Sequence, residues 1–267
     1  MQTFHTPSPI TVTVRLTAGQ ITLDTIEGDE SEVDLRDTGE ETSQQAVAQA
    51  RVELRGSELI VDVPRVRGGF LRGEAEVMVR IRCPQGSSLD VQTRSADVNA
   101  RGRLERVEVT SVSGDVSIEE AARAAVRSTS GDIRIERCGD LEVTSTSGDV
   151  RVLDLRGRGG VKTVSGDFNL GDFRGHLTVN SVSGDQRVEG AVEGDLALHA
   201  VSGDVVVGVR RGSRVWVDAR SLSGSTSSEL ELGDAPAPEG EGPLVELRVN
   251  TISGDVVVRR AAAPTRA

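Results

Sequence analysis

One short motif recurs along most of this chain: Ser-Gly-Asp, placed at the end of an alternating segment such as VEVTSVSGDV (107–116). The motif serines are Ser113, Ser130, Ser147, Ser165, Ser183, Ser202 and Ser253, and degenerate copies fit the series at Ser95 and Ser223. Successive copies are 18, 17, 17, 18, 18, 19, 21 and 30 residues apart. A nearly constant period of this length is typical of repeat proteins, in which each unit stacks on its neighbours.

Within each repeat, apolar residues alternate with polar ones. Val or Leu occupies the fourth position before the motif Ser in nearly every copy, and Ser, Thr or Ala occupies the second. After the motif, apolar residues return at Ile118, Ile135, Val152, Leu170, Val188, Val207 and Val258. Because side chains of a strand point alternately to its two faces, this pattern predicts a strand, a turn and a second strand in each repeat.

The motif itself is interpreted as the turn between the two strands. Gly adopts positive φ without a Cβ clash, and an Asp carboxylate can accept hydrogen bonds from nearby backbone N–H groups. The predicted turn ladder consists of Gly114, Asp115, Gly131, Asp132, Gly148, Asp149, Gly166, Asp167, Gly184, Asp185, Gly203, Asp204, Gly254 and Asp255. We assign these residues a structural role.

The repeat length favours one architecture. A unit of 17–19 residues is too short for a strand–helix–strand crossover. We therefore predict an all-β fold: a single-stranded β-solenoid (β-helix) with about eight or nine rungs, stacked about 4.8 Å apart. A β-sandwich of hairpins is the alternative. Aromatic residues make up 2% of the chain, so aliphatic side chains must fill the interior.

Three regions are expected along the chain. Residues 1–80 are predicted to form an N-terminal β-rich cap, residues 81–260 the repeat β-solenoid, and residues 261–267 a flexible tail. The Pro-, Gly- and Glu-rich segment 229–242 is expected to be an acidic loop.

The cap has patterns of its own. Segments 10–16 and 20–26 alternate around Thr-Ala-Gly and predict a hairpin, while 52–63 predicts strand, turn, strand. Thr42 and Gln45 have the spacing of a capping box, which predicts one short helix within 42–52.

The opening FHTPSPITVTVRLTAGQI, the predicted helix and the strand repeats carrying Ser-Gly-Asp together resemble a bacterial family of β-strand-repeat proteins. That family has no known function and is labelled "putative adhesin". The resemblance covers almost the whole chain, and the opening is most similar to actinobacterial members. It implies a β-solenoid-like fold, with neither an established enzymatic activity nor an agreed ligand.

Charge and hydropathy exclude several classes of partner. The net charge is −11, with acidic residues concentrated in 27–58 and 229–241 and no basic stripe, so we expect no binding to nucleic acid or to an anionic membrane. No apolar stretch is long enough for a membrane span, and the opening lacks the pattern of a secretory signal. We expect a cytoplasmic protein in which Cys83 and Cys138 are structural thiols.

The sequence contains no recognisable catalytic motif. His5, His176 and His199 are scattered, Lys162 is the only lysine, and no phosphate loop, nucleophile elbow or zinc spacing occurs. A row of Ca²⁺ ions along the Asp series would need six to eight oxygens per ion, and one Asp per rung is too sparse. We predict that the protein is not an enzyme and needs neither a cofactor nor calcium.

One column of residues suggests an interaction surface. The residue directly before the motif Ser is apolar in most repeats; these are Val112, Val164, Val182, Val201, Leu222 and Ile252. Strict alternation would point them outward as a docking column. A bend of the strand at this corner, which we favour, would turn them inward.

The resulting functional hypothesis is a non-enzymatic structural scaffold or protein-interaction module. It would bind an unidentified protein partner or self-associate. The alternatives are a glycan-binding or glycan-active solenoid and a calcium-stabilised rod.

Overall fold

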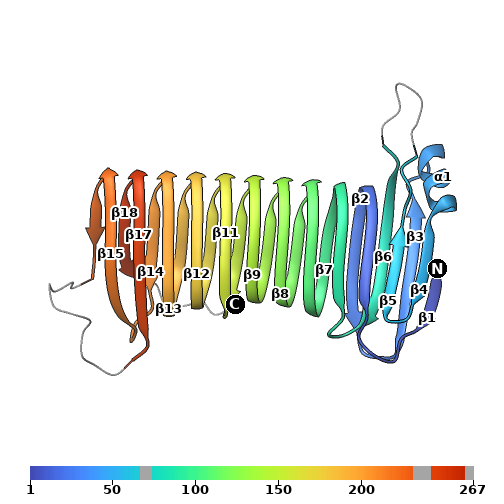
Figure 1. Cartoon of the computed structure of the whole chain (residues 1–267), viewed down its shortest axis with the longest axis horizontal. Coiled ribbons are helices and arrows are strands. Elements are labelled where there is room, and N and C mark those ends of the chain that lie inside the picture. The colour runs from blue at the N-terminus through green and yellow to red at the C-terminus, as the bar shows by residue number, and fades with distance from the viewer. Residues whose placement is uncertain (67–73, 231–241, 262–267) are drawn as a thin grey trace. The chain divides into compact units, whose positions relative to one another are not determined.

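The structure is a computed structural model that describes residues 1–66, 74–230 and 242–261. Strands account for about three quarters of these residues, and one helix occurs among them. The chain divides into two compact units, residues 1–135 and 136–267, and the boundary lies within strand β9 (Ile133–Ser147). Figure 1 labels the elements of both units, which are described in turn. Within the described ranges, no helix combines the length and hydropathy that a transmembrane span requires.

The first unit combines long parallel strands with a short antiparallel part. Its elements are β1 (Gln2–His5), β2 (Thr11–Ile26), β3 (Glu30–Asp37), α1 (Glu41–Gln49), β4 (Arg51–Arg55), β5 (Glu58–Asp62), β6 (Glu76–Pro84), β7 (Ser88–Ser113) and β8 (Val116–Ser130). Strand β2 is parallel to β5, β6 and β7, and β7 is parallel to β8. Strand β3 is antiparallel to both β1 and β6.

The predicted hairpin over 10–26 is wrong, because β2 is one continuous strand. At Gly19, with φ +123°, the chain turns a corner without reversing its direction. A Cβ at that position would lie 2.1 Å from the Val77 carbonyl oxygen, so the close approach of β6 also requires Gly. Both halves of β2 therefore keep their apolar side chains inside, on either side of the corner. The predicted strand, turn, strand of 52–63 is confirmed as the antiparallel pair β4–β5.

The predicted helix is confirmed, but its capping box is wrong. Helix α1 follows Glu40, which makes no capping hydrogen bond through its side chain, and Thr42 lies inside the helix. Ser43 makes the contacts that hold the helix in place. Its buried hydroxyl accepts the backbone N–H of Thr38 at 2.8 Å and donates to the Glu76 carbonyl oxygen at 2.8 Å. The tertiary contact with β6 has therefore replaced a local cap.

The second unit is a stack of parallel strands. After β9 it contains β10 (Val150–Leu155), β11 (Arg158–Ser165), β12 (Phe168–Ser183), β13 (Gln186–Ser202), β14 (Val205–Val209), β15 (Arg214–Ser223), β16 (Thr226–Ser228), β17 (Leu244–Ser253) and β18 (Val256–Arg260). The pairing aligns the motif serines of successive rungs, Ser165 with Ser183, Ser183 with Ser202, and Ser202 with Ser253. Parallel, in-register pairing rules out a sandwich of hairpins for these strands.

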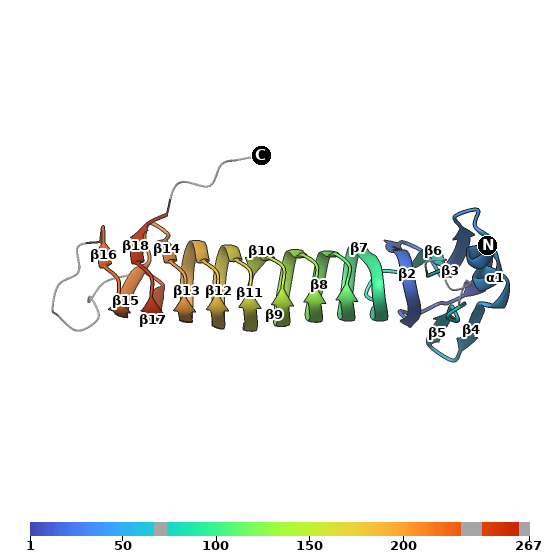
Figure 2. The ribbon, with the colours of Figure 1, turned by 90° about the horizontal axis from the view of Figure 1, so that it is seen from above.

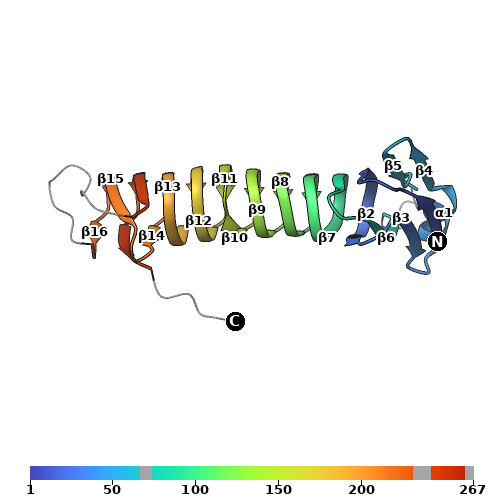
Figure 3. The ribbon, with the colours of Figure 1, turned by 90° about the horizontal axis from the view of Figure 1, so that it is seen from below.

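The order of the strands in space differs from their order in the sequence. Strand β17 pairs with β13 on one side and β15 on the other, and β18 likewise pairs with β14 and β16 (Figures 2 and 3). The last rung of the sequence is therefore inserted between the two rungs that precede it. We call the rung formed by β15 and β16 the edge rung.

The interior of the second unit is thin and aliphatic. Val161, Val179, Leu198 and Val249 line it from one side at 0% exposure, and Val152, Leu170, Val188, Val207 and Val258 line it from the other. The residue directly after the motif Asp also points inward, which sequence reasoning missed. It is Phe168 in one rung and Gln186 in the next, and the Gln186 Nε2 group donates to the His199 carbonyl oxygen at 2.9 Å.

The division of the chain into a cap (1–80), a repeat region (81–260) and a tail remains a prediction. The acidic loop expected at 229–242 and the tail expected at 261–267 lie almost entirely outside the described residues.

Candidate functional site

The motif glycines lie where one turn meets the turn of the neighbouring rung. Gly184 has φ +124°, which disfavours other residues. A Cβ on Gly184 would also lie 2.2 Å from the Gly166 carbonyl oxygen. Two independent constraints, backbone conformation and contact between rungs, therefore require Gly here.

The motif aspartates link successive rungs. In the second unit, the Asp167, Asp185, Asp204 and Asp255 backbone N–H groups each donate to Oδ1 of the Asp in the preceding rung, at 2.8–2.9 Å. Two hydrogen bonds of the same kind occur in the first unit. The Asp115 backbone N–H donates to Asp97 Oδ1 at 3.0 Å, and the Asp132 backbone N–H donates to Asp115 Oδ1 at 2.9 Å. We had expected these carboxylates to accept hydrogen bonds within their own turns. The stacking of rungs supplies a neighbouring turn as the donor instead.

The hydrogen bonds between rungs offset the repulsion among stacked carboxylates. The series ends at the edge rung, where Ser225 donates its backbone N–H to Asp255 Oδ1 at 2.7 Å. That hydrogen bond lowers the pKa of Asp255. Within the described residues, no three His, Cys, Asp or Glu side chains are arranged to hold a metal ion. The geometry of the series is that of a turn-to-turn hydrogen-bond ladder.

The apolar column before the motif Ser faces solvent, so the inward bend that we favoured is wrong. The exposed fractions are 50% for Val112, 49% for Val164, 49% for Val182, 45% for Val201, 52% for Ile252 and 83% for Leu222. The bend begins only at the Gly, one residue after the motif Ser. Val112 belongs to the first unit, and the other five belong to the second.

In the second unit these five side chains form one continuous strip, which we call the apolar strip. The pairings place them in the order Val164, Val182, Val201, Ile252 and Leu222. At about 4.8 Å per strand, the strip is about 20 Å long. The insertion of β17 makes it continuous, because Ile252 fills the position between Val201 and Leu222.

Polar side chains border the apolar strip. Two residues earlier on the same strands, and on the same outer face, lie Lys162, Asn180 and Arg220. The ladder aspartates lie beyond its other side, at the turn. An apolar centre within a polar rim is the usual anatomy of a protein interface.

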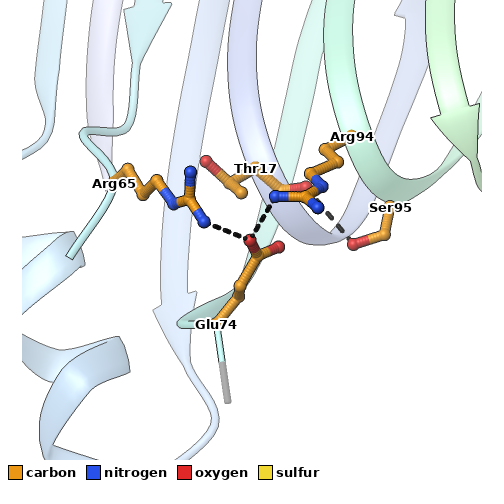
Figure 4. Close-up of polar contacts among 5 residues, drawn as sticks. All are labelled: Thr17, Arg65, Glu74, Arg94 and Ser95. Atoms are coloured by element: carbon orange, nitrogen blue, oxygen red, sulfur yellow. Dashed lines mark hydrogen bonds and ion pairs between the residues drawn. The ribbon is translucent and has the colours of Figure 1, made fainter. Parts of the chain in front are cut away.

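A second feature, missed by sequence reasoning, is an open cavity in the first unit with a volume of about 550 Å³. It lies over β2 and β7, and its lining includes Arg15, Arg65 and Arg94. Arg65 and Arg94 both donate to Oε1 of Glu74, at 2.8 and 3.0 Å (Figure 4). These residues are far apart in the sequence and meet only through the parallel pairing of β2 with β5 and β7. We call this feature the arginine cavity.

Among the described residues, the remaining reactive side chains show no catalytic arrangement. Cys83 and Cys138 are buried thiols outside any disulfide, and burial raises the pKa of Cys83 to about 11, which keeps the thiol protonated. His176 lies at the surface with Nδ1 3.4 Å from Asp195 Oδ2, and His199 Nδ1 lies 3.5 Å from Asn250 Nδ2.

Several solved structures are similar to this chain at low sequence identity. One, from Parabacteroides distasonis, is described as a "putative adhesin"; it is 9% identical, with 96% of each chain covered and a TM-score of 0.43. Another with the same description, from Bacteroides fragilis, is 12% identical and covers 96% of this chain and 95% of its own, with a TM-score of 0.38. A "putative lipid binding protein" from Parabacteroides distasonis is 9% identical over 98% of this chain and 94% of its own, with a TM-score of 0.32.

No curated protein matches the sequence. A family model described as "Toastrack DUF4097" matches residues 14–259. The nearly all-β, solenoid-like structure agrees with that match, and the chain belongs to the Toastrack DUF4097 family.

Proposed function

We propose that this protein is a non-enzymatic interaction module, and that the apolar strip of its second unit is the surface that a protein partner contacts. The observation that carries the proposal is the exposure of five aliphatic side chains on adjacent strands, between 45% and 83%. Single exposed apolar residues are ordinary, whereas a contiguous row of them marks an interaction site.

The rigidity of the paired strands that carry the apolar strip favours a role in binding a protein partner. The residues before and after each strip residue pair in register with the neighbouring strand. Ser181 pairs with Ala200 and Ser183 pairs with Ser202, which fixes Val182 and Val201 side by side. The inward-facing residues that precede the strip residues in the four inner strands are buried; these are Thr163, Ser181, Ala200 and Thr251. A partner would therefore meet a preformed surface and would lose little entropy in ordering it.

The partner is either another protein or a second copy that binds side by side. End-to-end addition of rungs to the second unit is disfavoured, because the edge rung carries Ser225 where the other rungs carry Asp. A further rung stacked on it would find no carboxylate for its own turn N–H group.

The alternatives lack a supporting feature. A glycan-binding face needs a row of exposed aromatic rings; in the second unit Phe168 and Phe173 are buried, and the partly exposed ring of Trp216 is covered by the Arg248 guanidinium at 5.5 Å. For a calcium-stabilised rod we would expect a chelator to lower the melting temperature, whereas a hydrogen-bond ladder predicts no change.

The test places a charge in the apolar strip. Val182→Asp and, separately, Val201→Asp would be compared with Leu153→Asp, which changes another exposed apolar residue of the same unit, 41% exposed. Mass by light scattering would be measured across protein concentration, and proteins retained from a lysate of the source cells would be quantified. We expect both strip variants to lose the association and Leu153→Asp to keep it.

The proposal fails if the wild-type chain is monomeric at all concentrations and retains no protein that the strip variants lose. It also fails if Leu153→Asp abolishes the association as fully as Val182→Asp does. Thermal unfolding of each variant would establish that the folded state is compared throughout.

A further inference from the structure

We infer that the arginine cavity of the first unit binds a carboxylate of an acidic peptide, and that Glu74 occupies the carboxylate position in the free chain. This inference is independent of the apolar strip, which lies in the second unit.

The first observation is the convergence of two guanidinium groups on one oxygen. Arg65 follows β5, Arg94 lies on β7, and Glu74 precedes β6 (Figure 4). Nη2 of Arg65 and Nη1 of Arg94 lie 2.8 and 3.0 Å from Glu74 Oε1. Hydrogen bonds between guanidinium and carboxylate groups are among the strongest in proteins, and the planar Arg fork matches a carboxylate in shape. The chain itself thus shows which chemical group fits between these two side chains.

The second observation is that Glu74 does not use all the positive charge of the cavity. Arg15 also lines the cavity and makes no ion pair within 4.0 Å among the described residues. Three guanidinium groups therefore line the cavity and Glu74 pairs with two of them, in a chain whose net charge is −11. Asp62, which is in register with Arg15 in the β2–β5 pairing, and Asp90 on β7 partly offset this excess.

The third observation is the room beside the ion pairs. Leu16 and Val63, 3% and 6% exposed, lie beneath the opening, and Gln92, Thr93 and Thr110 line it with polar groups. A volume of about 550 Å³ is much larger than a single carboxylate needs and falls in the range of ligand pockets. An acidic side chain with its flanking peptide would fill it, with the acid replacing Glu74 and its neighbours contacting the apolar floor.

The accessibility of the ion pairs makes this exchange feasible. The side chains of Arg65, Arg94 and Glu74 are 48%, 57% and 30% exposed, respectively. Exposed ion pairs contribute little to stability, so an incoming carboxylate competes with a weakly held one.

The experiment is a titration of the full chain into a fluorescein-labelled tetraglutamate peptide, followed by fluorescence anisotropy at low salt. Glu74→Gln removes the internal competitor and should tighten binding about tenfold, whereas Arg94→Ala should weaken it about tenfold. Arg94→Lys keeps the charge but loses the fork, and should also weaken binding. The matched control is Glu32→Gln, which removes a half-buried carboxylate paired with Arg82 at 3.3 Å elsewhere in the same unit and should leave the affinity for the peptide unchanged.

Several results would overturn the inference. Equal affinities for the wild type and Glu74→Gln would show that Glu74 does not occupy the binding position. Equal tightening by Glu32→Gln would show a general effect of net charge. If a labelled tetraglutamine peptide bound as tightly as tetraglutamate, the carboxylate would not be the group that the cavity recognises. Displacement of the peptide by inorganic phosphate at lower concentration than by acetate would assign the cavity to phosphate instead.

Discussion

The interior rungs and the edge rung of the second unit have the same strand–turn–strand plan, but several of their aligned columns carry different residues. In the inserted rung, Val249, Val256 and Val258 are buried, whereas in the edge rung the aligned Ala219 is half-buried and Thr226 and Ser228 are exposed. The interior turns carry Asp, and the edge turn carries Ser225. Each of these differences removes a group that would contact, or accept a hydrogen bond from, a further rung stacked on the outer side of the edge rung.

This difference teaches that the degeneracy of the copy at 223–225 reports its position in space. The degenerate copy at 223–225 is not the last in the sequence, yet it forms the edge. The regular copy at 253–255 is the last in the sequence, and it lies between two rungs. Within the second unit, the copy that lacks the Asp is the one that is covered on one side only.

The largest expected effect is steric. Gly184→Ala should lower the free energy of unfolding by about 3 kcal/mol or more, since it combines an unfavourable φ with a clash against the Gly166 carbonyl oxygen. Gly224→Ala brings a Cβ to 2.1 Å from the Gly254 carbonyl oxygen, but the edge rung can move outward. Chemical denaturation of the two variants should show the smaller loss for Gly224→Ala. Equal losses would mean that the edge rung is held as firmly as an interior one.

The second effect tests the strand order directly. Val249→Ala should cost about 2 kcal/mol, because this side chain is 0% exposed between β13 and β15. Val217→Ala removes the same atoms from a half-buried position of the edge rung and should cost less than about 1 kcal/mol. Urea unfolding midpoints would measure both. If the strands were stacked in sequence order, Val217 would be the more sensitive of the two.

The third effect concerns the hydrogen-bond ladder. Asp204→Ala leaves the Asp255 N–H group without its acceptor and should cost roughly 1 kcal/mol, observed as a lower melting temperature. Asp204→Asn retains an oxygen acceptor and should lose less. Ser225→Ala should lower the melting temperature less than Asp204→Ala does, because it removes only the hydroxyl that also hydrogen-bonds to Asp255, while the backbone N–H that donates to Asp255 remains. A loss on Ser225→Ala equal to that on Asp204→Ala would contradict this description of the edge.

The smallest effect is a pH dependence at the last step of the ladder. The folded-state pKa of Asp255 is lowered below 3.8 by the Ser225 N–H group, so its ionised form stabilises the fold. That stabilisation is complete above pH 3.8 and disappears as the pH falls through the lowered pKa. Comparing wild type with Asp255→Asn by thermal unfolding from pH 6 to pH 2 should show a difference that shrinks in acid. If the difference in melting temperature between wild type and Asp255→Asn were constant from pH 6 to pH 2, the charge of Asp255 would have no role in the stability.

The sequence by itself determined most of the local structure. Alternation located the strands of the repeats, and the spacing of Ser-Gly-Asp located their turns, because both depend on backbone geometry that repeats in every rung. The composition predicted an aliphatic interior. The family resemblance agreed with these conclusions.

Only the tertiary structure decided which rung lies next to which. Parallel pairing depends on free strand edges and not on proximity in the chain, so β17 could pair between β13 and β15 without any local signal. The structure also decided that the apolar column faces outward. The corner begins at the Gly, so the residue before the motif Ser still follows the alternation of the strand. Parallel pairing also explains the arginine cavity, because Arg65, Glu74 and Arg94 meet only where β2, β5 and β7 are stacked.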